Sequence, residues 1–333
     1  MKSKIRIGQN MISAQEFKIS RRHAVAGIAA AGAGLGTRGL AKAAQPEEDS
    51  LEPLFRFAFM PDFHLRRDLR SPEGMEASLK AVMALDPKPA FIVTGGDLIH
   101  DMRSQTPEEC EEMANLFARV WNDNTDLPTY HALGNHDFAG LTNEDFPKNH
   151  PLFGSNFLKE KLGLPGLNYS FDHGGWHFIV LHNVAITDDR KTVGEFPEDS
   201  LRFLREDLQR SDGMPVMLFG HYPPVTAIEF FNGNAKKTEK GWELAYGRAT
   251  RNPEALIEVI GKANVRAFFS GHIHRLDRIE AKGTTFICSG SVSGDQWKGQ
   301  EVDTEEGFAV IDCYADGSFD YAYHDYGWEA APA

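Results

Sequence analysis

Five short polar fragments interrupt this chain, and each of them directly follows a run of apolar residues. An apolar run that ends in a polar turn is typical of a buried strand in an α/β protein. Because the carboxyl ends of parallel strands meet at one edge of a sheet, five distant segments are expected to converge in the folded chain. The fragments are Asp62-Phe63-His64, Gly96-Asp97, Gly134-Asn135-His136-Asp137, Gly220-His221 and Gly271-His272-Ile273-His274.

The fragments together supply Asp, Asn and His side chains in the number and kind that two divalent metal ions require. Taken singly, each would be a turn-capping Asp or Asn or a satisfied core histidine, so the combination carries the prediction. Two metal ions about 3.5–4 Å apart can neutralise phosphoryl oxygens, activate a water and stabilise a leaving alkoxide. Mixed imidazole and carboxylate ligands suit Mn, Fe or Zn better than Ca or Mg. The predicted chemistry is hydrolysis of a phosphate ester at a dinuclear centre.

Strand and helix patterns alternate in the first half of the chain, and hairpin patterns follow later. The prediction is an α/β fold, a four-layer α/β/β/α sandwich of two mixed β-sheets flanked by helices. Strands are expected at 54–60, 90–94, 128–133, 168–171, 176–182, 215–219 and 265–270, with antiparallel strands within 278–290 and 307–323. Helices are expected at 72–85, 106–121, 199–210 and 252–262, with Ser71, Thr106 and Asn252 as N-caps.

The first 43 residues have the three parts of an export signal. Ser20-Arg21-Arg22 begins a twin-arginine pattern, a short Ala/Gly-rich run follows, and Ala41-Lys42-Ala43 forms a cleavage site. The alternative for this segment is a disordered basic tail. The sequence departs from the twin-arginine pattern at Ala24, where such signals usually carry a bulky hydrophobic residue. We expect a signal peptide at 1–43, a flexible linker at 44–53 and one domain at 54–328. The twin-arginine machinery would then be a partner and the protein periplasmic or secreted, without a stable membrane span.

The charge of the chain restricts its partners. Eight Lys or Arg and one acid give residues 1–43 a net charge of +7, which leaves −20 on the rest of a chain with formal net charge −13. Such a surface repels polyanions, so a small phosphate ester is a better partner than a nucleic-acid duplex. Cys110, Cys288 and Cys313 are expected to be free and structural, although an oxidising compartment would allow a Cys288–Cys313 bridge.

The order Asp-x-His, Gly-Asp, Gly-Asn-His-Asp, Gly-His, Gly-His-x-His resembles the calcineurin-like metallophosphoesterase family over residues 54–325. The resemblance implies that two metal ions share Asp97 and that a metal-bridging hydroxide attacks phosphorus. It implies that Asp62, His64 and His274 bind one ion and that Asn135, His221 and His272 bind the other. His136 would bind no metal and would stabilise the transition state or protonate the leaving oxygen. Asp137 would orient His136 or merely cap the next turn.

The identity of the ester is left open by these motifs. Gly220-His221-Tyr222-Pro223-Pro224 resembles the class III cyclic-nucleotide phosphodiesterase branch, which implies phosphodiester hydrolysis, cyclic nucleotides included. The alternatives are a phosphomonoesterase of the same fold, a protein phosphatase, and a metal-binding scaffold without catalysis. Aromatic residues in the long segments 138–156 and 222–251 would contact the leaving group, and His100 would line the mouth of the site. Trp297 is expected in the site wall or in the core.

Overall fold

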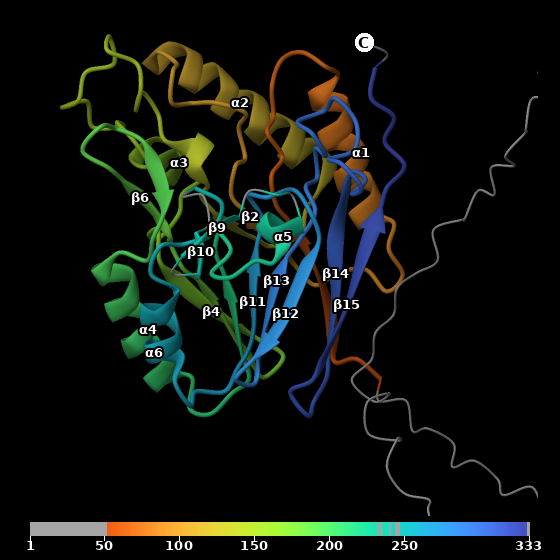
Figure 1. Cartoon of the computed structure of the whole chain (residues 1–333). Helices are drawn as coiled ribbons and strands as arrows, with labels where there is room; N and C mark the ends of the chain where they lie inside the picture. The colour runs from red at the N-terminus through yellow and green to blue at the C-terminus, as the bar shows by residue number, and fades with distance from the viewer. Residues whose placement is uncertain (1–51, 232, 234, 240, 244–246, 332–333) are drawn as a thin grey trace, which may run out of the picture.

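The computed structural model describes residues 52–231, 233, 235–239, 241–243 and 247–331, and the fold consists of two large sheets with helices outside them (Figure 1). The expected signal peptide and nearly all of the linker lie outside these residues. The strands of the first sheet are β1 (Phe55–Met60), β2 (Ile92–Gly95), β3 (Thr129–Ala132), β14 (Gly307–Cys313) and β15 (Phe319–Asp325). Those of the second are β4 (Tyr169–His173), β5 (Trp176–Val180), β8 (Val216–Phe219), β11 (Val265–Ser270), β12 (Asp277–Ala281) and β13 (Thr284–Cys288).

Both sheets mix parallel and antiparallel pairs, as the sequence predicts. The first sheet has the order β15-β14-β1-β2-β3, with β1, β2 and β3 parallel and β14 antiparallel to both of its neighbours. The second has the order β12-β13-β11-β8-β5-β4, and its four inner strands are parallel. Two small hairpins complete the strands, β6 (Val184–Ile186) with β7 (Thr192–Gly194) and β9 (Lys236–Thr238) with β10 (Gly241–Glu243).

The two sheets pack face to face through an aromatic core. Successive side chains of a strand point to opposite faces, so Phe57 and Phe59 of β1 enter the core between the sheets, whereas Ala58 and Met60 pack toward helices. The opposite sheet contributes Phe178, Phe219 and Phe269 to the same layer. Phe57 and Phe219, for example, meet edge to face with ring centroids 5.9 Å apart. This inter-sheet layer fixes the relative position of the strand ends that carry the polar fragments.

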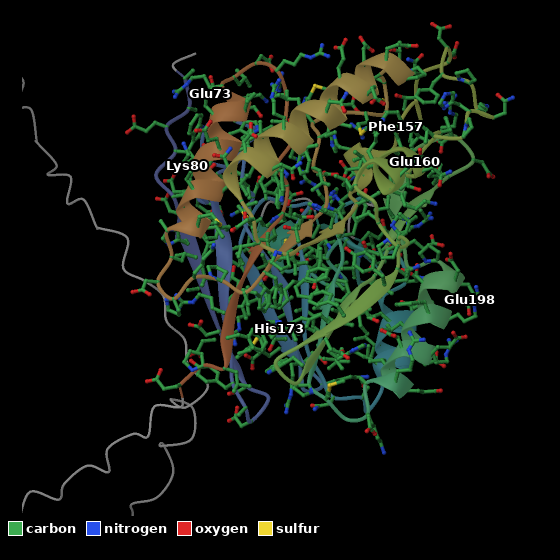
Figure 2. All side chains as sticks on the ribbon, turned by 180° about the vertical axis from the view of Figure 1, so that it is seen from behind. Glu73, Lys80, Phe157, Glu160, His173 and Glu198 are labelled. Atoms are coloured by element: carbon green, nitrogen blue, oxygen red, sulfur yellow. The ribbon has the colours of Figure 1, made fainter. Side chains whose placement is uncertain are left out.

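Helices cover the outer face of each sheet, which gives the four expected layers. In Figure 1, α1 (Ser71–Met83) and α2 (Pro107–Asn124) lie together at the top and α4 (Glu198–Arg210) and α6 (Pro253–Ile260) at the lower left. The apolar side of each helix faces its sheet, while charged residues such as Glu73 and Lys80 on α1 and Glu198 on α4 lie at the periphery (Figure 2). The remaining helices are α3 (Asn156–Lys161), α5 (Ile228–Phe231) and the 3₁₀ turn Asn135–Asp137.

Thr106 and Asn252 lie at the N-cap position as the sequence predicts, whereas Ser71 is the first residue of its helix. Thr106 forms the expected capping box with Glu109. Helix α1 instead begins at Ser71 after Arg70, and the Ser71 hydroxyl accepts a bond from the Arg66 backbone amide at 3.0 Å. The Asn252 side chain makes no cap, because it bonds both backbone groups of Phe196. The Ser71 hydroxyl thus bonds the loop that precedes its helix and the Asn252 side chain bonds a segment 56 positions away, so neither side chain caps its own helix.

The cysteines and the helices bear on two further expectations. Cys110, Cys288 and Cys313 are all buried and free, so the alternative of a Cys288–Cys313 bridge is not realised. None of the helices in the described part of the chain combines the length and apolar character that crossing a bilayer requires.

A buried charge network on the second sheet makes the stability of the fold depend on pH. His177 lies between two carboxylates, with Nδ1 2.6 Å from Asp172 and Nε2 2.9 Å from Asp207. Burial lowers the pKa of His177, but the bonds to Asp207 and Asp172 outweigh burial and raise it above its ordinary value. The imidazolium therefore stabilises the fold fully below pH about 6.5, and this contribution is lost as pH rises through the folded-state pKa.

We expect His177→Gln to lower the free energy of unfolding by about 1–2 kcal/mol near pH 6, because the buried Asp207 loses one of its two cationic partners and keeps only Arg210. The loss should shrink as pH rises toward 9. Urea unfolding of both proteins across this range measures the difference, and His324→Gln on β15 is the control for removing a histidine elsewhere. A pH-independent difference would contradict the charge argument.

Candidate metal centre

The five polar fragments meet at the edge of the two sheets where their parallel strands end. The Asp62, Asp97 and Asn135 segments follow β1, β2 and β3 of the first sheet. His221 follows β8, and His272 and His274 follow β11, of the second sheet. The expected convergence is therefore observed, and all seven candidate ligands belong to one cluster.

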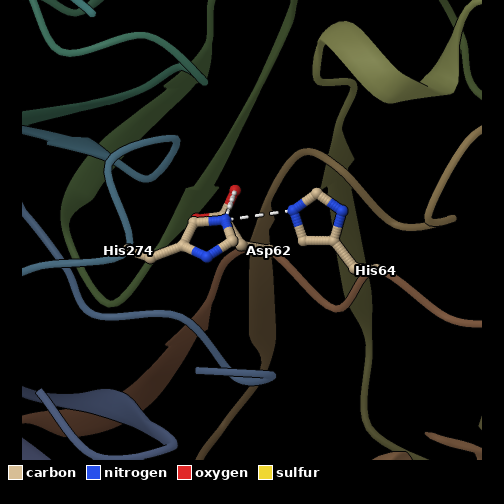
Figure 3. Close-up of side chains that lie close together, drawn as sticks. All are labelled: Asp62, His64 and His274. Carbon is tan, nitrogen blue, oxygen red and sulfur yellow. Dashed lines mark hydrogen bonds and ion pairs between the residues drawn. The ribbon is translucent and has the colours of Figure 1, made fainter. Parts of the chain in front are cut away.

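The donor atoms of this cluster fall into three overlapping groups, in each of which all atoms lie within 4.8 Å of one another. The ion-pair distances are 3.7 Å for Asp62–His274, 3.5 Å for His64–Asp97 and 3.3 Å for His221–Asp97. Figure 3 shows His64 and His274 facing each other with Asp62 beside them. Asp97 belongs to two of the groups, which suits a carboxylate shared by two ions. The groups are Asp62/His64/His274, His64/Asp97/His136 and Asp97/His221/His272.

Backbone carbonyl groups fix the tautomers of three of the histidines. His221 donates from Nδ1 to Gly95 O at 2.9 Å, His272 from Nε2 to Gly247 O at 2.6 Å, and His274 from Nδ1 to Gly294 O at 2.7 Å. A neutral imidazole that donates from one nitrogen has a lone pair on the other. Metal-binding histidines are normally held in this way by an acceptor on the far side of the ring. Each of the three rings is thus oriented as a ligand.

The lone pairs left by these bonds point at one another. His274 Nε2 lies 3.0 Å from His64 Nε2, His272 Nδ1 lies 3.2 Å from His221 Nε2, and the latter lies 2.9 Å from Asn135 Oδ1. Acceptor atoms at these separations repel unless a proton or a cation lies between them. A buried set of nitrogen and carboxylate donors fits a divalent transition metal better than Ca²⁺ or Mg²⁺. The residues present therefore fit the metal centre that the sequence predicts.

The electrostatics of the cluster separate His221 from the other rings. Burial lowers the pKa of His221, but Asp97 outweighs burial and raises it to about 9, so a metal ion would have to displace a proton from His221 Nε2. Burial lowers the pKa of His64 and His272 well below the ordinary value and that of His274 to about 4, so these rings are neutral. Burial also raises the pKa of Asp62. Burial acts against ionisation of Asp97 too, but His221 and His136 hold the pKa of its carboxyl well below the usual range. Asp97 is thus an anion at the centre of the cluster.

Five of the seven candidate ligands occupy the left-handed region of backbone conformation. The φ angles are 59° at Asp62, 41° at His64, 50° at Asp97, 72° at His272 and 61° at His274. Each such residue costs about 1–3 kcal/mol and persists where the surroundings over-determine it, as at functional sites. Here Asp62 N bonds Gly96 O at 3.0 Å and His64 N bonds Asp97 O at 2.9 Å. The strand ends hold one another in the conformation that turns the ligands inward.

Two glycines of the motifs leave room for the carboxylates. A Cβ atom at Gly134 would overlap the Asp97 carboxylate, and one at Gly271 would overlap that of Asp62. Each carboxylate uses this proximity to bond a backbone amide, Asp97 Oδ1 from His136 N at 2.8 Å and Asp62 Oδ2 from His272 N at 2.9 Å. The glycine at the start of each of these two motifs therefore has a steric cause.

His136 lies at the rim of this cluster, with its ring centroid 4.8 Å from that of His64. Its Nδ1 donates to the His100 carbonyl oxygen, and Arg103 Nη2 lies 3.2 Å from the same nitrogen. The Nε2 atom is thereby left as the nitrogen that can act toward a substrate. Burial lowers the pKa of His136, and the cation of Arg103 acts in the same direction.

Asp137 does not hold His136 directly, which corrects its prediction as a catalytic residue. Its carboxylate accepts backbone N–H bonds from Leu98 at 3.0 Å, Ile99 at 3.2 Å and Gly134 at 2.8 Å. It therefore caps the turns that follow β2 and β3, which is the alternative that the sequence left open. Burial raises the pKa of this carboxyl to about 7.

Several residues that support the site carry little sequence signal. The hydroxyls of Ser291 and Ser293 donate to the Asp62 carbonyl oxygen, both at 2.8 Å. Trp297 is fully buried in the core, the second of its two expected places, and its Nε1 donates to Phe63 O at 2.9 Å in the loop that carries Asp62 and His64. The side-chain oxygen Oδ1 of Asn183 accepts from the His221 backbone amide at 3.0 Å. Only the small-residue run 290–294 could have pointed to this support.

The two long segments flank the site in different ways. Phe138 is buried against Tyr222 and Leu141 and is part of a small core. By contrast, Phe231 and Trp242 are exposed, and Phe230 meets Trp242 edge to face at 5.8 Å. The later segment reaches the cluster itself through the bond between Gly247 O and His272. Its expected contact with a substrate stays a prediction.

Comparison with known proteins gives consistent matches. A family model for calcineurin-like phosphoesterases matches residues 55–276. A 3',5'-cyclic-nucleotide phosphodiesterase of Nostoc sp. is 24% identical over 257 residues, which cover 75% of this chain and 82% of that protein. The serine/threonine-protein phosphatase CPPED1 of Danio rerio is 28% identical over 237 residues, 68% of each chain. The crystal structure of a dimetal phosphatase from Danio rerio aligns with a TM-score of 0.55 and 16% identity, covering 79% of this chain and 94% of that one.

Proposed function

Because this chain belongs to the calcineurin-like phosphoesterase family and is a metal-dependent hydrolase, we propose that it cleaves phosphodiesters at a centre of two divalent metal ions. The observation that carries the proposal is the convergence of histidine nitrogens and two carboxylates in three overlapping groups, two of which share Asp97. One ion would be held by Asp62, His64 and His274 and the other by Asn135, His221 and His272, with Asp97 shared. Mn, Fe or Zn suit this donor set.

Two bound ions would supply positive charge at the phosphoryl oxygens and a water of lowered pKa. The chain supplies rigidity and orientation. Carbonyl partners hold the rings of His221, His272 and His274 so that the ligand geometry need not reorganise during the reaction. Deep burial of Asp62 and Asp97 keeps the surroundings of the reacting phosphate low in dielectric constant.

His136 is the residue that we place against the substrate. Its Nδ1 is held by the His100 carbonyl oxygen, and its ring adjoins His64 and Asp97. From this position Nε2, once protonated, can donate a hydrogen bond to a phosphoryl oxygen or a proton to the leaving oxygen. Both actions leave the two ligand sets intact, so the role of His136 is separable from metal binding.

The proposed substrate class is the phosphodiester, cyclic nucleotides included, in line with the name of the Nostoc relative. The name of the Danio rerio relative favours a second candidate, hydrolysis of phosphomonoesters such as phosphoproteins. Turnover of bis(4-nitrophenyl) phosphate and of 4-nitrophenyl phosphate after loading with Mn²⁺ separates the two, with metal content measured on the same samples. Faster turnover of the diester is expected. Two bound ions without turnover of either ester would favour the scaffold alternative.

We also propose that residues 1–43 are a twin-arginine signal peptide, which would place residues 44–53 as a linker and residues 54–328 as the catalytic domain in the periplasm or outside the cell. The support is the order of arginine pair, apolar run and small-residue site. Replacing both Arg21 and Arg22 with Lys is expected to retain full-length protein in the cytoplasm. Export of a shortened form of this variant would contradict the assignment.

A further inference from the structure

A cavity of about 200 Å³ lies beside the metal centre. Two of its residues, Leu65 and Arg66, directly follow the ligand His64, and His100 follows Asp97 by three positions. The His100 ring lies 5.9 Å from the ring of His64 and 6.0 Å from that of His136. The cavity is therefore within reach of a substituent on a phosphate bound at the centre. Its lining residues are Leu65, Arg66, Arg67, His100, Gln105, Glu109 and Met113.

The cavity brings two guanidinium groups together in a strongly acidic chain. Arg66 pairs with Asp68, whose side chain is 63% exposed, and Arg67 pairs with Glu112, whose side chain is 67% exposed. Arg66 holds Asp68 through two bonds, from Nε and from Nη2, and the exposed carboxylate of Asp68 is the group that an anion entering the cavity would displace. Glu109 also lines the cavity, but its carboxylate accepts from the Thr106 amide at 2.9 Å in the capping box of α2.

Two polar groups of the cavity have hydrogen-bonding capacity that the fold leaves unused. Arg66 Nη1 lies 3.5 Å from His100 Nε2, and because a guanidinium only donates, the proton of neutral His100 is placed on Nδ1. Burial, with Arg66 and His136 adding to it, lowers the pKa of His100 to about 4. Within the part of the chain that the structure describes, the buried His100 Nδ1 and Gln105 Oε1 have no hydrogen-bond partner. The Gln105 amide can turn to present its NH₂ group instead.

We propose that this cavity binds a second anionic group of the substrate, a carboxylate or a phosphate, carried by one of the alcohols esterified to the scissile phosphate. Arg66 is the principal contact, because its side chain is less exposed than that of Arg67 and because it also contacts His100. The inference rests on the proposed phosphodiesterase function and adds a substrate class to it. Recognition of a second anion gives the enzyme discrimination among diesters that the metal centre alone cannot provide.

The test compares two ligands that differ only in a carboxylate, propylphosphonate and 3-phosphonopropionate, on the metal-loaded protein. Isothermal calorimetry gives the two Kd values, and inhibition of bis(4-nitrophenyl) phosphate hydrolysis gives the matching Ki values. We expect 3-phosphonopropionate to bind about tenfold more tightly or better, as for a charge-assisted bond. In Arg66→Gln the two ligands should bind within about twofold of each other. Arg66→Lys should retain part of the difference.

Two control variants isolate the effect. Arg119→Gln removes a positive charge from an exposed position of α2 outside the cavity and should leave the tenfold difference unchanged. Asp68→Asn removes the carboxylate that competes for Arg66 and should leave or enlarge the difference. Equal binding of the two ligands by the unaltered protein, or equal loss of both in Arg66→Gln, would overturn the inference. The proposed function survives either of these outcomes, provided that propylphosphonate binds and the diester is hydrolysed. If the unaltered protein neither bound propylphosphonate nor hydrolysed the diester, the proposed function itself would be overturned.

Discussion

Replacing Asp97 with Asn is expected to lower kcat/KM for bis(4-nitrophenyl) phosphate by about 10³-fold or more and to reduce the bound metal from two ions to one or fewer. A 10³-fold loss corresponds to about 4 kcal/mol of transition-state stabilisation. The reason lies in the central position of this carboxylate. Asp97 belongs to two of the three donor groups and lies 3.5 Å from His64 and 3.3 Å from His221, whereas an amide carries no charge to share between cations.

The fold of this variant should survive, because the amide oxygen of Asn can still accept the bond from the His136 amide that Asp97 Oδ1 accepts now. Elemental analysis of protein dialysed against excess Mn²⁺ gives the metal content, and thermal unfolding verifies the fold. Asp123→Asn on the exposed side of α2 makes the same chemical change away from the site and should alter neither quantity. A variant that kept two ions and its activity would show that Asp97 does not bridge.

The convergence of the candidate ligands could be predicted from the sequence because each of them follows a local feature of the chain. An apolar strand ends, a glycine follows, and the next residue is forced close to its neighbours, as at Gly134 and Gly271. These features lie within a few residues of one another, so they can be recognised in the sequence without knowledge of the fold. The meeting of the five fragments then follows from the rule that parallel strands present their carboxyl ends at one edge.

The groups that orient the ligands could not be predicted, because they are backbone carbonyls brought in by tertiary structure. Gly95 O holds His221 across 126 positions of the sequence, and any residue at position 95 would offer the same carbonyl oxygen. The role of Asp137 was ambiguous for a related reason. A carboxylate that follows a histidine can bond its ring or the surrounding amides, and only the placement of Leu98 and Ile99 decides between them.

The sequence also could not predict which of the two sheets each C-terminal hairpin joins. The hairpin patterns indicate that β12 pairs with β13 and β14 with β15, and both pairs form. Alternation of side chains shows which face of a strand is buried but does not name the neighbouring strand. In the structure β14 joins β1 in the first sheet, whereas β13 joins β11 in the second. The late strands therefore tie both sheets to the C-terminal part of the chain.

The second large effect is expected for His136→Ala, which should lower kcat by about 10²–10⁴-fold while both metal ions stay bound. The carbonyl groups that orient His221, His272 and His274 come from Gly95, Gly247 and Gly294, so removing the His136 ring disturbs none of these bonds. Elemental analysis and steady-state kinetics measure the two quantities. The control is His150→Ala, which removes a partly buried histidine from the segment that follows the Gly134–Asp137 motif. Loss of one ion would instead make His136 a ligand, as its place beside His64 and Asp97 allows.

The leaving group then distinguishes the two actions open to His136. If its Nε2 gives a proton to the leaving oxygen, the variant should lose far more activity on diphenyl phosphate than on bis(4-nitrophenyl) phosphate, because nitrophenolate departs readily without a proton. If the ring only stabilises charge on the phosphoryl oxygens, the two losses should be equal. The His100 carbonyl fixes Nδ1 as a donor in either case, so Nε2 alone can act on the substrate. Proton donation therefore requires a doubly protonated His136, a form that the carboxylates of Asp97 and Asp101 favour and that the negative charge of a bound phosphate would favour further.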